Sequence, residues 1–287
     1  MKKVECYKGD ALEFHKAVLK AKRNTKDDPD YKKRMTGREA TISAQFSEYN
    51  NRIQANTLEA MTQIALTENE KRDYLRLYRY EDKCFQNLEE ELSKDENGHE
   101  YPYCPLCDIG EYHSFDHILP KGIFPVLCDH PKNLMRSCTT CNGYKSEIWL
   151  EDGKRKYLDL YIDDLPNIQM LFVKLGLEGD VVTYEYYVSD MNRPDPEIFR
   201  MYKNSFEKFM LAKRYKRQTN EEITNMVCSM KDSIKLFHAS DSQLLNSILV
   251  SATEMQVRHG FNYWRAILKL AFYNDKKMFA WLKSKAV

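Results

Sequence analysis

The residues best suited to chemistry in this 287-residue chain lie between positions 104 and 145. This segment holds two widely separated Cys-x-x-Cys pairs, Cys104/Cys107 and Cys138/Cys141. Four thiolates make a closed tetrahedral site, which is the structural kind of zinc site. We therefore expect a Zn2+ ion that joins two distant chain segments and takes no part in catalysis. The alternative is a set of buried free thiols.

Three further side chains in the same segment could serve as reserve zinc ligands. They are Cys128, His113 and His130. Each is better explained as an ordinary loop residue. In an intracellular protein, paired Cys-x-x-Cys motifs favour a metal site over disulfides.

An Asp-His pair and a later Asn-x-x-Lys complete the chemically suited set. Hydrolysis of a phosphodiester needs a base for the attacking water and a cation for the developing charge. His117 suits the base, because the unperturbed pKa of histidine is close to neutrality. Asp116 and Asn142 offer oxygen ligands for a hard cation such as Mg2+. Lys145, one helical turn after Asn142, could contact a phosphate oxygen.

These side chains need particular elements to bring them together. Residues 115–119 are typical of a short, half-buried strand, and residues 133–138 of its antiparallel partner. The proline-containing residues 120–132 predict an ordered loop, and a helix is expected after Cys141. In this arrangement of strand, loop, strand and helix, the side chains of Asp116 and Asn142 can converge from different elements. The side chain of His117 then points beside them. The alternative is an ordinary structural histidine, which the zinc frame and the trailing Asn-x-x-Lys disfavour.

The segment resembles the HNH endonuclease family, which has the ββα-metal fold. The resemblance rests on the cysteine pairs, Asp116-His117-Ile118-Leu119-Pro120, Asn133-Leu134, and Asn142 to Lys145. It implies that His117 is the general base and that Asp116 and Asn142 hold a catalytic Mg2+ or Mn2+ ion. It also implies that Asn133 orients the loop and the base, and that the substrate is DNA.

Two departures from the family pattern bear on this site. Asn142 stands at the last metal position in place of histidine, a known variant that favours Mg2+ or Mn2+ over softer ions. The loop has only Gly122 where many members have a glycine pair.

The sequence from Asp116 to Pro125, with predicted helices on both sides, also looks like stand-alone HNH subunits of bacterial antiphage systems such as the Septu type, which work beside an ATPase subunit. That resemblance implies a role in antiviral defence and an ATPase partner.

The rest of the chain predicts a mainly α fold. Ten Gly and nine Pro in 287 residues favour long helices over turn-rich β structure. We expect a helical scaffold that encloses the small zinc-bound ββα-metal module, with a short β element near 180–188. The expected regions are N-terminal helices at 1–100, the nuclease module at 101–152 and a mainly helical region at 153–287.

Apolar spacing predicts the helices of this scaffold. One is expected over 38–66, and a second runs from the capping box Thr67/Glu70 to a stop at 95–98. A helix from Glu197 is expected to finish in the basic run 213–217, and another follows it. The last two are expected to be a helix capped by Ser240 or Asp241 and one over 261–286.

The net charge of +1 gives no global field that attracts a polyanion, so nucleic-acid binding would need a local patch or a partner. Two basic clusters are candidates, although each has an alternative as solvated surface. The second cluster could also complement a helix dipole at its C-terminus. The clusters are Lys20, Lys22, Arg23, Lys32, Lys33 and Arg34, and Lys213, Arg214, Lys216 and Arg217.

The N-terminus lacks the apolar core of a signal peptide, and no run of about 18 apolar residues occurs. We therefore expect a cytoplasmic protein without a membrane span. The leading interpretation is a metal-dependent HNH endonuclease that cleaves DNA and is gated by an ATPase partner. The alternatives are a zinc-stabilised nucleic-acid or protein binding module without catalysis, and an HNH nuclease that acts on RNA.

Overall fold

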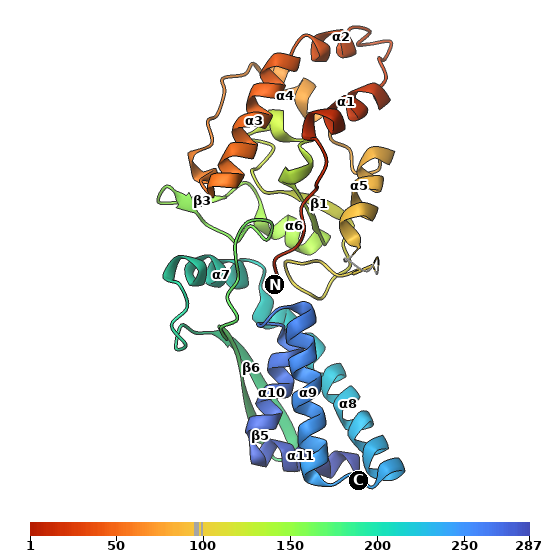
Figure 1. The fold of residues 1–287 in the computed structure, drawn as a ribbon, viewed down its shortest axis with the longest axis vertical. Helices are drawn as coiled ribbons and strands as arrows, with labels where there is room; N and C mark the ends of the chain where they lie inside the picture. Colours follow the sequence, from red (N-terminus) through yellow and green to blue (C-terminus); the bar gives the residue numbers. More distant parts are fainter. Residues whose placement is uncertain (95–97, 99) are drawn as a thin grey trace. The chain divides into compact units, whose positions relative to one another are not determined.

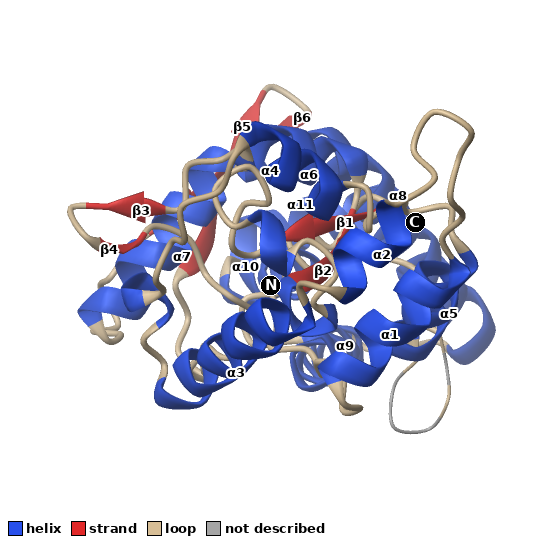
Figure 2. Ribbon diagram, turned by 90° about the horizontal axis from the view of Figure 1, so that it is seen from above, coloured by secondary structure: helices blue, strands red, loops and turns tan. Residues whose placement is uncertain are grey.

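The computed structural model describes residues 1–94, 98 and 100–287. Asp95, Glu96 and Asn97, where we expected a helix to stop, lie outside the described residues. Helices make up most of the regular structure and the strands are short (Figure 2), so the expected mainly α fold is confirmed. No helix in this described part of the chain is both long and apolar enough to span a bilayer.

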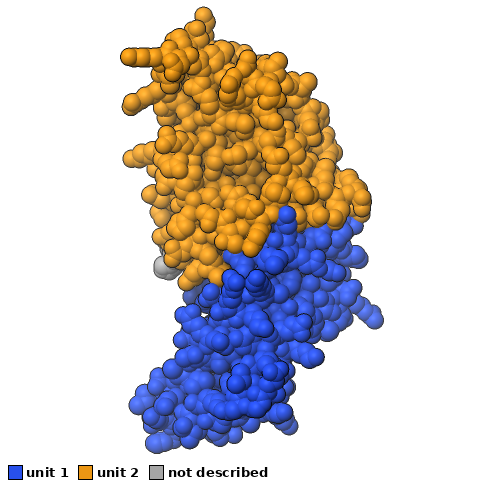
Figure 3. All heavy atoms as spheres, turned by 180° about the vertical axis from the view of Figure 1, so that it is seen from behind, with its two compact units in different colours: residues 1–3, 164–287 blue, residues 4–163 orange. Residues whose placement is uncertain are grey.

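The chain divides into two compact units (Figure 3), residues 4–163 and residues 1–3 with 164–287. Apart from residues 1–3, the regions 1–100 and 101–152 therefore lie within one unit. They share a unit because side chains from the N-terminal helices pack in one core with residues of the central segment, such as Phe115 and Leu134. The unit of residues 4–163 extends past residue 152 and ends at Asp163.

Five helices form the scaffold of residues 4–163, and they lie around the central segment (Figure 1). The side chain of Asp10 caps the first by accepting a hydrogen bond from the Glu13 N–H. The expected capping box of Thr67 and Glu70 begins the fourth. The helices are α1 (Ala11–Ala21), α2 (Tyr31–Thr36), α3 (Glu39–Ala55), α4 (Glu68–Leu75) and α5 (Lys83–Ser93).

Two of these helices are shorter than the apolar spacing indicated. The helix expected over 38–66 ends at Ala55, because Asn56 takes a left-handed conformation with φ of 52°. The single helix expected over 68–94 is two, since an irregular stretch separates α4 from α5. Leu77 lies in that stretch and is fully buried, so apolar spacing continues where the helix does not.

The central segment has the expected order of strand, loop, strand and helix. Strands β1 (Ser114–His117) and β2 (Leu134–Ser137) pair antiparallel, with His117 opposite Leu134. The loop between them contains two short 3₁₀ turns, η2 (Pro125–Leu127) and η3 (Pro131–Asn133). Helix α6 (Thr139–Lys145) begins at Thr139, earlier than expected, because Cys138 acts as its N-cap.

A small hairpin, β3 (Leu150–Glu151) and β4 (Lys154–Arg155), follows α6. The chain then returns to the start of β2, where the Tyr161 hydroxyl donates a hydrogen bond to the Leu134 carbonyl over 2.7 Å. The Tyr161 N–H in turn donates to Asp159 Oδ1 over 2.9 Å. This segment therefore supports β2 from a position distant in the sequence.

The unit of residues 1–3 and 164–287 combines one hairpin with five helices. Strand β6 (Val181–Val188) confirms the expected β element, and it pairs with β5 (Leu171–Glu178) across a turn at Gly179, whose φ is 62°. A capping box at Ser240 begins α9, as expected. The helices are α7 (Pro196–Lys208), α8 (Leu211–Phe237), α9 (Asp241–His259), α10 (Trp264–Asn274) and α11 (Lys276–Ala286).

Two boundaries in this unit differ from expectation. The basic run 213–217 lies in the first turns of α8, because Met210 takes a left-handed conformation (φ 53°) that ends the preceding helix. These cations therefore do not complement a helix C-terminus. The helix expected over 261–286 is broken at Asp275, whose carboxylate caps α11 by accepting from the N–H groups of Lys277 and Met278.

Candidate functional site

The four cysteines expected to bind zinc lie together in one buried cluster. Their sulfur atoms are all within 4.8 Å of one another. The sulfurs of Cys107 and Cys138 are 3.8 Å apart, which matches the edge of about 3.8 Å that a tetrahedron with Zn–S bonds of about 2.3 Å requires. The donor type, number and spacing of this cluster therefore fit a zinc ion.

Backbone geometry places these sulfurs. The Cys104 carbonyl accepts hydrogen bonds from the N–H groups of Cys107 and Asp108, which turns the first pair back on itself. At the second pair, the Cys138 sulfur accepts from the Cys141 N–H over 3.4 Å at the start of α6. Burial raises the pKa of the Cys104 thiol, a cost that a bound cation would offset by stabilising the thiolate.

The reserve zinc ligands lie outside this cluster. Cys128 is buried and its thiol donates to the Tyr74 carbonyl over 2.9 Å. The His113 side chain is largely exposed and lies 3.7 Å from Glu111. The His130 ring is fully buried and packs edge-on against an aromatic ring of α3. Their loop positions therefore explain these residues, as the sequence indicated.

His117 lies at the end of β1 and is almost fully buried, with 7% of its surface exposed. Its Nε2 is 2.9 Å from the Cys128 carbonyl oxygen, and its ring packs edge-on against Tyr78 at 4.6 Å. A carbonyl only accepts, so Nε2 carries the proton and Nδ1 keeps its lone pair. Burial lowers the pKa of His117 to about 3, so the imidazole is neutral near pH 7.

Asn133 is fully buried and ties the loop between β1 and β2 together. Its Oδ1 accepts hydrogen bonds from the Leu119 N–H over 2.8 Å and the Tyr49 hydroxyl over 3.2 Å. Its Nδ2 donates to the carbonyls of Leu119 and Leu127, both over 3.1 Å. Leu127 directly precedes Cys128, so Asn133 positions the stretch of backbone that bonds His117.

Asp116 and Lys145 form a buried ion pair in which Lys145 Nζ lies 2.7 Å from Asp116 Oδ2. The same ammonium donates to the carbonyls of His117 over 2.7 Å and Ile118 over 3.2 Å. Burial raises the pKa of Asp116, while Lys145 opposes that rise. The side chain that we expected to contact a phosphate is thus engaged inside the chain.

Asn142 lies one turn before Lys145, on the same side of α6. Its Nδ2 donates to Ser114 Oγ over 3.1 Å and to the Phe115 carbonyl over 3.4 Å. Ser114 and Asp116 share one face of β1, because strand side chains alternate. Helix α6 therefore lies against the face that carries Asp116, and the chain offers a carboxylate and an amide there, oxygen donors that suit Mg2+ or Mn2+.

Two residues at this site were not singled out from the sequence. Tyr78 contacts the His117 ring, and its hydroxyl lies within hydrogen-bond reach of the Phe115 backbone. Its apolar spacing with Leu75 and Phe85 predicts burial, but nothing local places it beside His117, because it lies in the irregular stretch between α4 and α5. Ser114 bonds Asn142, and its place two residues before Asp116 on a strand could have indicated the shared face.

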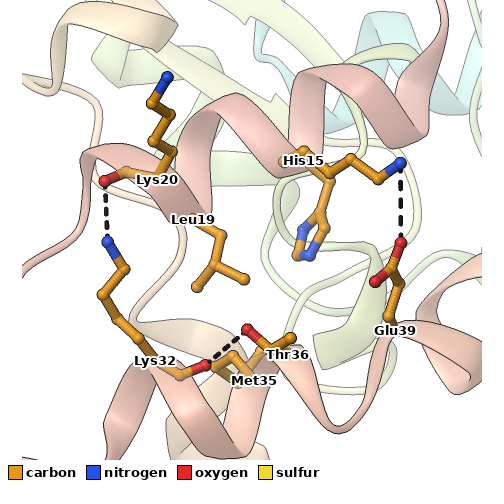
Figure 4. A pocket seen from close by; sticks show the side chains of 8 residues that line it. His15, Leu19, Lys20, Lys32, Met35, Thr36 and Glu39 are labelled. Atoms are coloured by element: carbon orange, nitrogen blue, oxygen red, sulfur yellow. Dashed lines mark hydrogen bonds and ion pairs between the residues drawn. The ribbon is translucent and has the colours of Figure 1, made fainter.

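The loop that holds His117 is also supported from α1. His15 Nδ1 lies 2.7 Å from Asp129 Oδ2, and both residues are buried. Asp129 directly follows Cys128, so this pair anchors the loop beside the carbonyl that accepts from His117. In Figure 4 the His15 ring points into a recess between α1 and α2, where Lys32 donates to the Lys20 carbonyl.

The two basic clusters are only partly available to a ligand. In the first, Lys22 pairs with Asp82 over 2.5 Å, and Arg34 pairs with Asp28 and Asp73. Lys20, Arg23 and Lys33 are exposed, whereas Lys32 is partly covered. In the second, Tyr215 stacks in the core on Trp264, whereas Lys213, Lys216 and Arg217 are exposed.

No protein-family model, no curated protein and no solved structure matches this chain.

Proposed function

We propose that this protein is a metal-dependent endonuclease of the HNH type that hydrolyses phosphodiester bonds in DNA. The observation that carries the proposal is the neutral His117 at the end of β1, held through Nε2 by the Cys128 carbonyl. Asp116 precedes it in β1, and α6 brings Asn142 to the same strand. A zinc-bound cluster of Cys104, Cys107, Cys138 and Cys141 would fix these elements around it.

In this proposal His117 accepts a proton from the attacking water at Nδ1, because its Nε2–H is engaged. Asp116 and Asn142 would hold a divalent ion, which when bound supplies charge stabilisation at the phosphate and the leaving oxygen. Asn133 keeps the loop and the Cys128 carbonyl in place. It therefore acts as a positioning residue for the base.

The substrate itself would strengthen the base. Burial now keeps the pKa of His117 at about 3. A phosphate anion beside the ring would raise that pKa, because an opposite charge stabilises the imidazolium. The histidine thus becomes a competent base when the phosphate arrives.

The biological setting in this proposal is bacterial antiphage defence, with an ATPase partner that gates the nuclease. The net charge of +1 supports dependence on a partner for tight binding, since the chain has no global field for a polyanion. Local contacts to the DNA phosphates would come from Lys20, Lys33 and Arg23 or from the exposed cations of α8. Co-purification with the partner, followed by cleavage with and without ATP, tests this setting.

The activity is tested by incubating the zinc-loaded chain with plasmid DNA and with a structured RNA, in Mg2+, in Mn2+ and in a chelator. DNA cleavage that requires the divalent ion supports the proposal. Cleavage of RNA alone would move the substrate to RNA. The matched variants are His117→Ala and His113→Ala, and only the first should lose cleavage.

One observation favours a second candidate, a zinc-stabilised binding module without catalysis. Lys145 already neutralises the Asp116 carboxylate, so the chain is stable without a second metal at this position. This candidate predicts zinc binding, binding of a nucleic acid or protein partner, and no effect of His117→Ala on that binding. Divalent-dependent cleavage by the wild-type chain contradicts it.

A further inference from the structure

Lys145 occupies a site that is built for a cation. Its side chain is 9% exposed, and its ammonium reaches three oxygens, namely Asp116 Oδ2 and the carbonyls of His117 and Ile118. An ammonium has three donors, so the three oxygens match its full capacity. The Asp116 oxygen that faces Lys145, one of the oxygens that would attract a hard metal ion, is therefore already in use.

A divalent ion bound at Asp116 would lie close to the ammonium at its present position, and the two like charges would repel in a nearly dry site. Lysine is suited to leave, since its charge sits on a flexible four-carbon stem. Resting on the proposed function, we propose that Lys145 is an exchangeable internal cation. Its ammonium neutralises Asp116 in the metal-free chain, leaves when a divalent ion binds, and then contacts a phosphate of the substrate.

The exchange links metal binding to substrate binding. A displaced ammonium beside a bound metal ion needs an anion, and a nucleic-acid phosphate supplies one. A metal ion alone must therefore break the ion pair and leave the ammonium uncompensated. When metal and phosphate bind together, the metal neutralises Asp116 and the phosphate neutralises Lys145. Linkage then requires that each ligand raises the affinity for the other. In this account the ion pair between Lys145 and Asp116 persists until both the metal and the phosphate are present.

The test measures Mn2+ binding to the full zinc-loaded chain. The concentration of free Mn2+ is monitored by electron paramagnetic resonance. Lys145→Met removes the competing ammonium and should tighten Mn2+ binding by about 5- to 150-fold, the usual range for coupled sites. Lys121→Met is the matched control. It removes an exposed cation whose Nζ lies 4.9 Å from the Tyr78 ring beside His117, and it should change the affinity much less.

The second arm adds a short DNA duplex in the His117→Ala background, so that the DNA stays intact. DNA should tighten Mn2+ binding when Lys145 is present and should do so much less in the Lys145→Met double variant. Equal Mn2+ affinity of the wild type and Lys145→Met, with binding lost in Asp116→Asn, overturns the exchange but keeps the metal site. Absence of Mn2+ binding in every variant overturns both the exchange and the proposed function.

Misfolding is separated from the exchange by two further variants. Lys145→Gln also lacks the charge and should bind Mn2+ as tightly as Lys145→Met. Lys145→Arg keeps the charge and should retain the weak affinity of the wild type. Zinc content and circular dichroism identify any variant that has lost its fold. If Lys145→Arg and Lys145→Gln bind Mn2+ equally while both are folded, the charge of Lys145 does not compete with the metal.

Discussion

The cysteine cluster and the end of β1 lie in the same unit, yet they are prepared for their ligands in different ways. The cluster presents four like donors within 4.8 Å of one another. At the end of β1, the carboxylate of Asp116 is already paired with Lys145. The first arrangement has the donor set of a zinc site, whereas the second is neutralised by the chain itself.

In our proposal, this difference separates a structural site from a regulated one. Buried thiolates without a cation are costly, so we expect the cluster and the fold around it to depend on zinc. The buried carboxylate is compensated without metal, so β1 and α6 keep their geometry in the resting state. Substitution of the cysteines should therefore lower the stability of the fold. Substitution of His117, Asp116 or Lys145 should instead change the function.

The largest expected effect comes from breaking the cysteine cluster. Cys138→Ser should release zinc and unfold the module around β1, because a structural zinc contributes about 10 kcal/mol in small domains, comparable with the whole stability of a domain. Zinc content and thermal unfolding measure the effect. Cys228→Ser changes an exposed thiol of the other unit and should change neither quantity. A Cys138→Ser chain that keeps its zinc and its melting temperature would refute the structural role.

An intermediate effect is expected at Asn133. Asn133→Ala leaves the buried backbone groups of Leu119 and Leu127 without their partner, at about 1–3 kcal/mol for each group. We expect a loss of about 3 kcal/mol in the free energy of unfolding, measured with urea, while zinc content stays unchanged. Asn142→Ala removes donor bonds at a partly exposed site and should cost about 1 kcal/mol. Equal losses in the two variants would contradict the account of the loop.

The smallest effect is a pH dependence at Asp159, which supports β2 through Tyr161. Burial raises its pKa to about 6, above the unfolded value of about 3.9. The folded state therefore binds more protons between these values, and the Asp159 charge destabilises the fold above about pH 6. Asp159→Asn should stabilise the chain by about 1–3 kcal/mol at pH 7.5 and by less near pH 4.5. A pH-independent difference in urea unfolding would show that Asp159 does not titrate in this window.

The central segment could be anticipated from the sequence because its signals are local. Cys-x-x-Cys spacing places each sulfur pair within one turn, and the alternation around Asp116 indicates a strand. The strand–loop–strand–helix order and the cysteine cluster are both present in the structure. The mainly α fold followed from sparse glycine and proline together with long apolar periodicities.

What could not be anticipated depends on backbone breaks and on tertiary contacts. Asn56 and Met210 take left-handed conformations that end helices, although the apolar spacing continues past them. The ion pair between Lys145 and Asp116 exists only because α6 packs on one face of β1. Tyr78 contacts His117 from an irregular stretch between two helices, a contact that apolar spacing alone does not predict. Sequence types thus indicate the donors of a site, and packing decides how they are paired.

The most direct test of the central claim is the ratio of two cleavage rates. Wild type and His117→Ala are compared on plasmid DNA at saturating Mg2+, after both have been shown to carry the same zinc content. The account predicts that the variant keeps its zinc and its fold and cleaves about 10²–10⁴-fold more slowly, the usual contribution of a general base. Equal rates for the two chains, or no metal-dependent cleavage by the wild type, would contradict it.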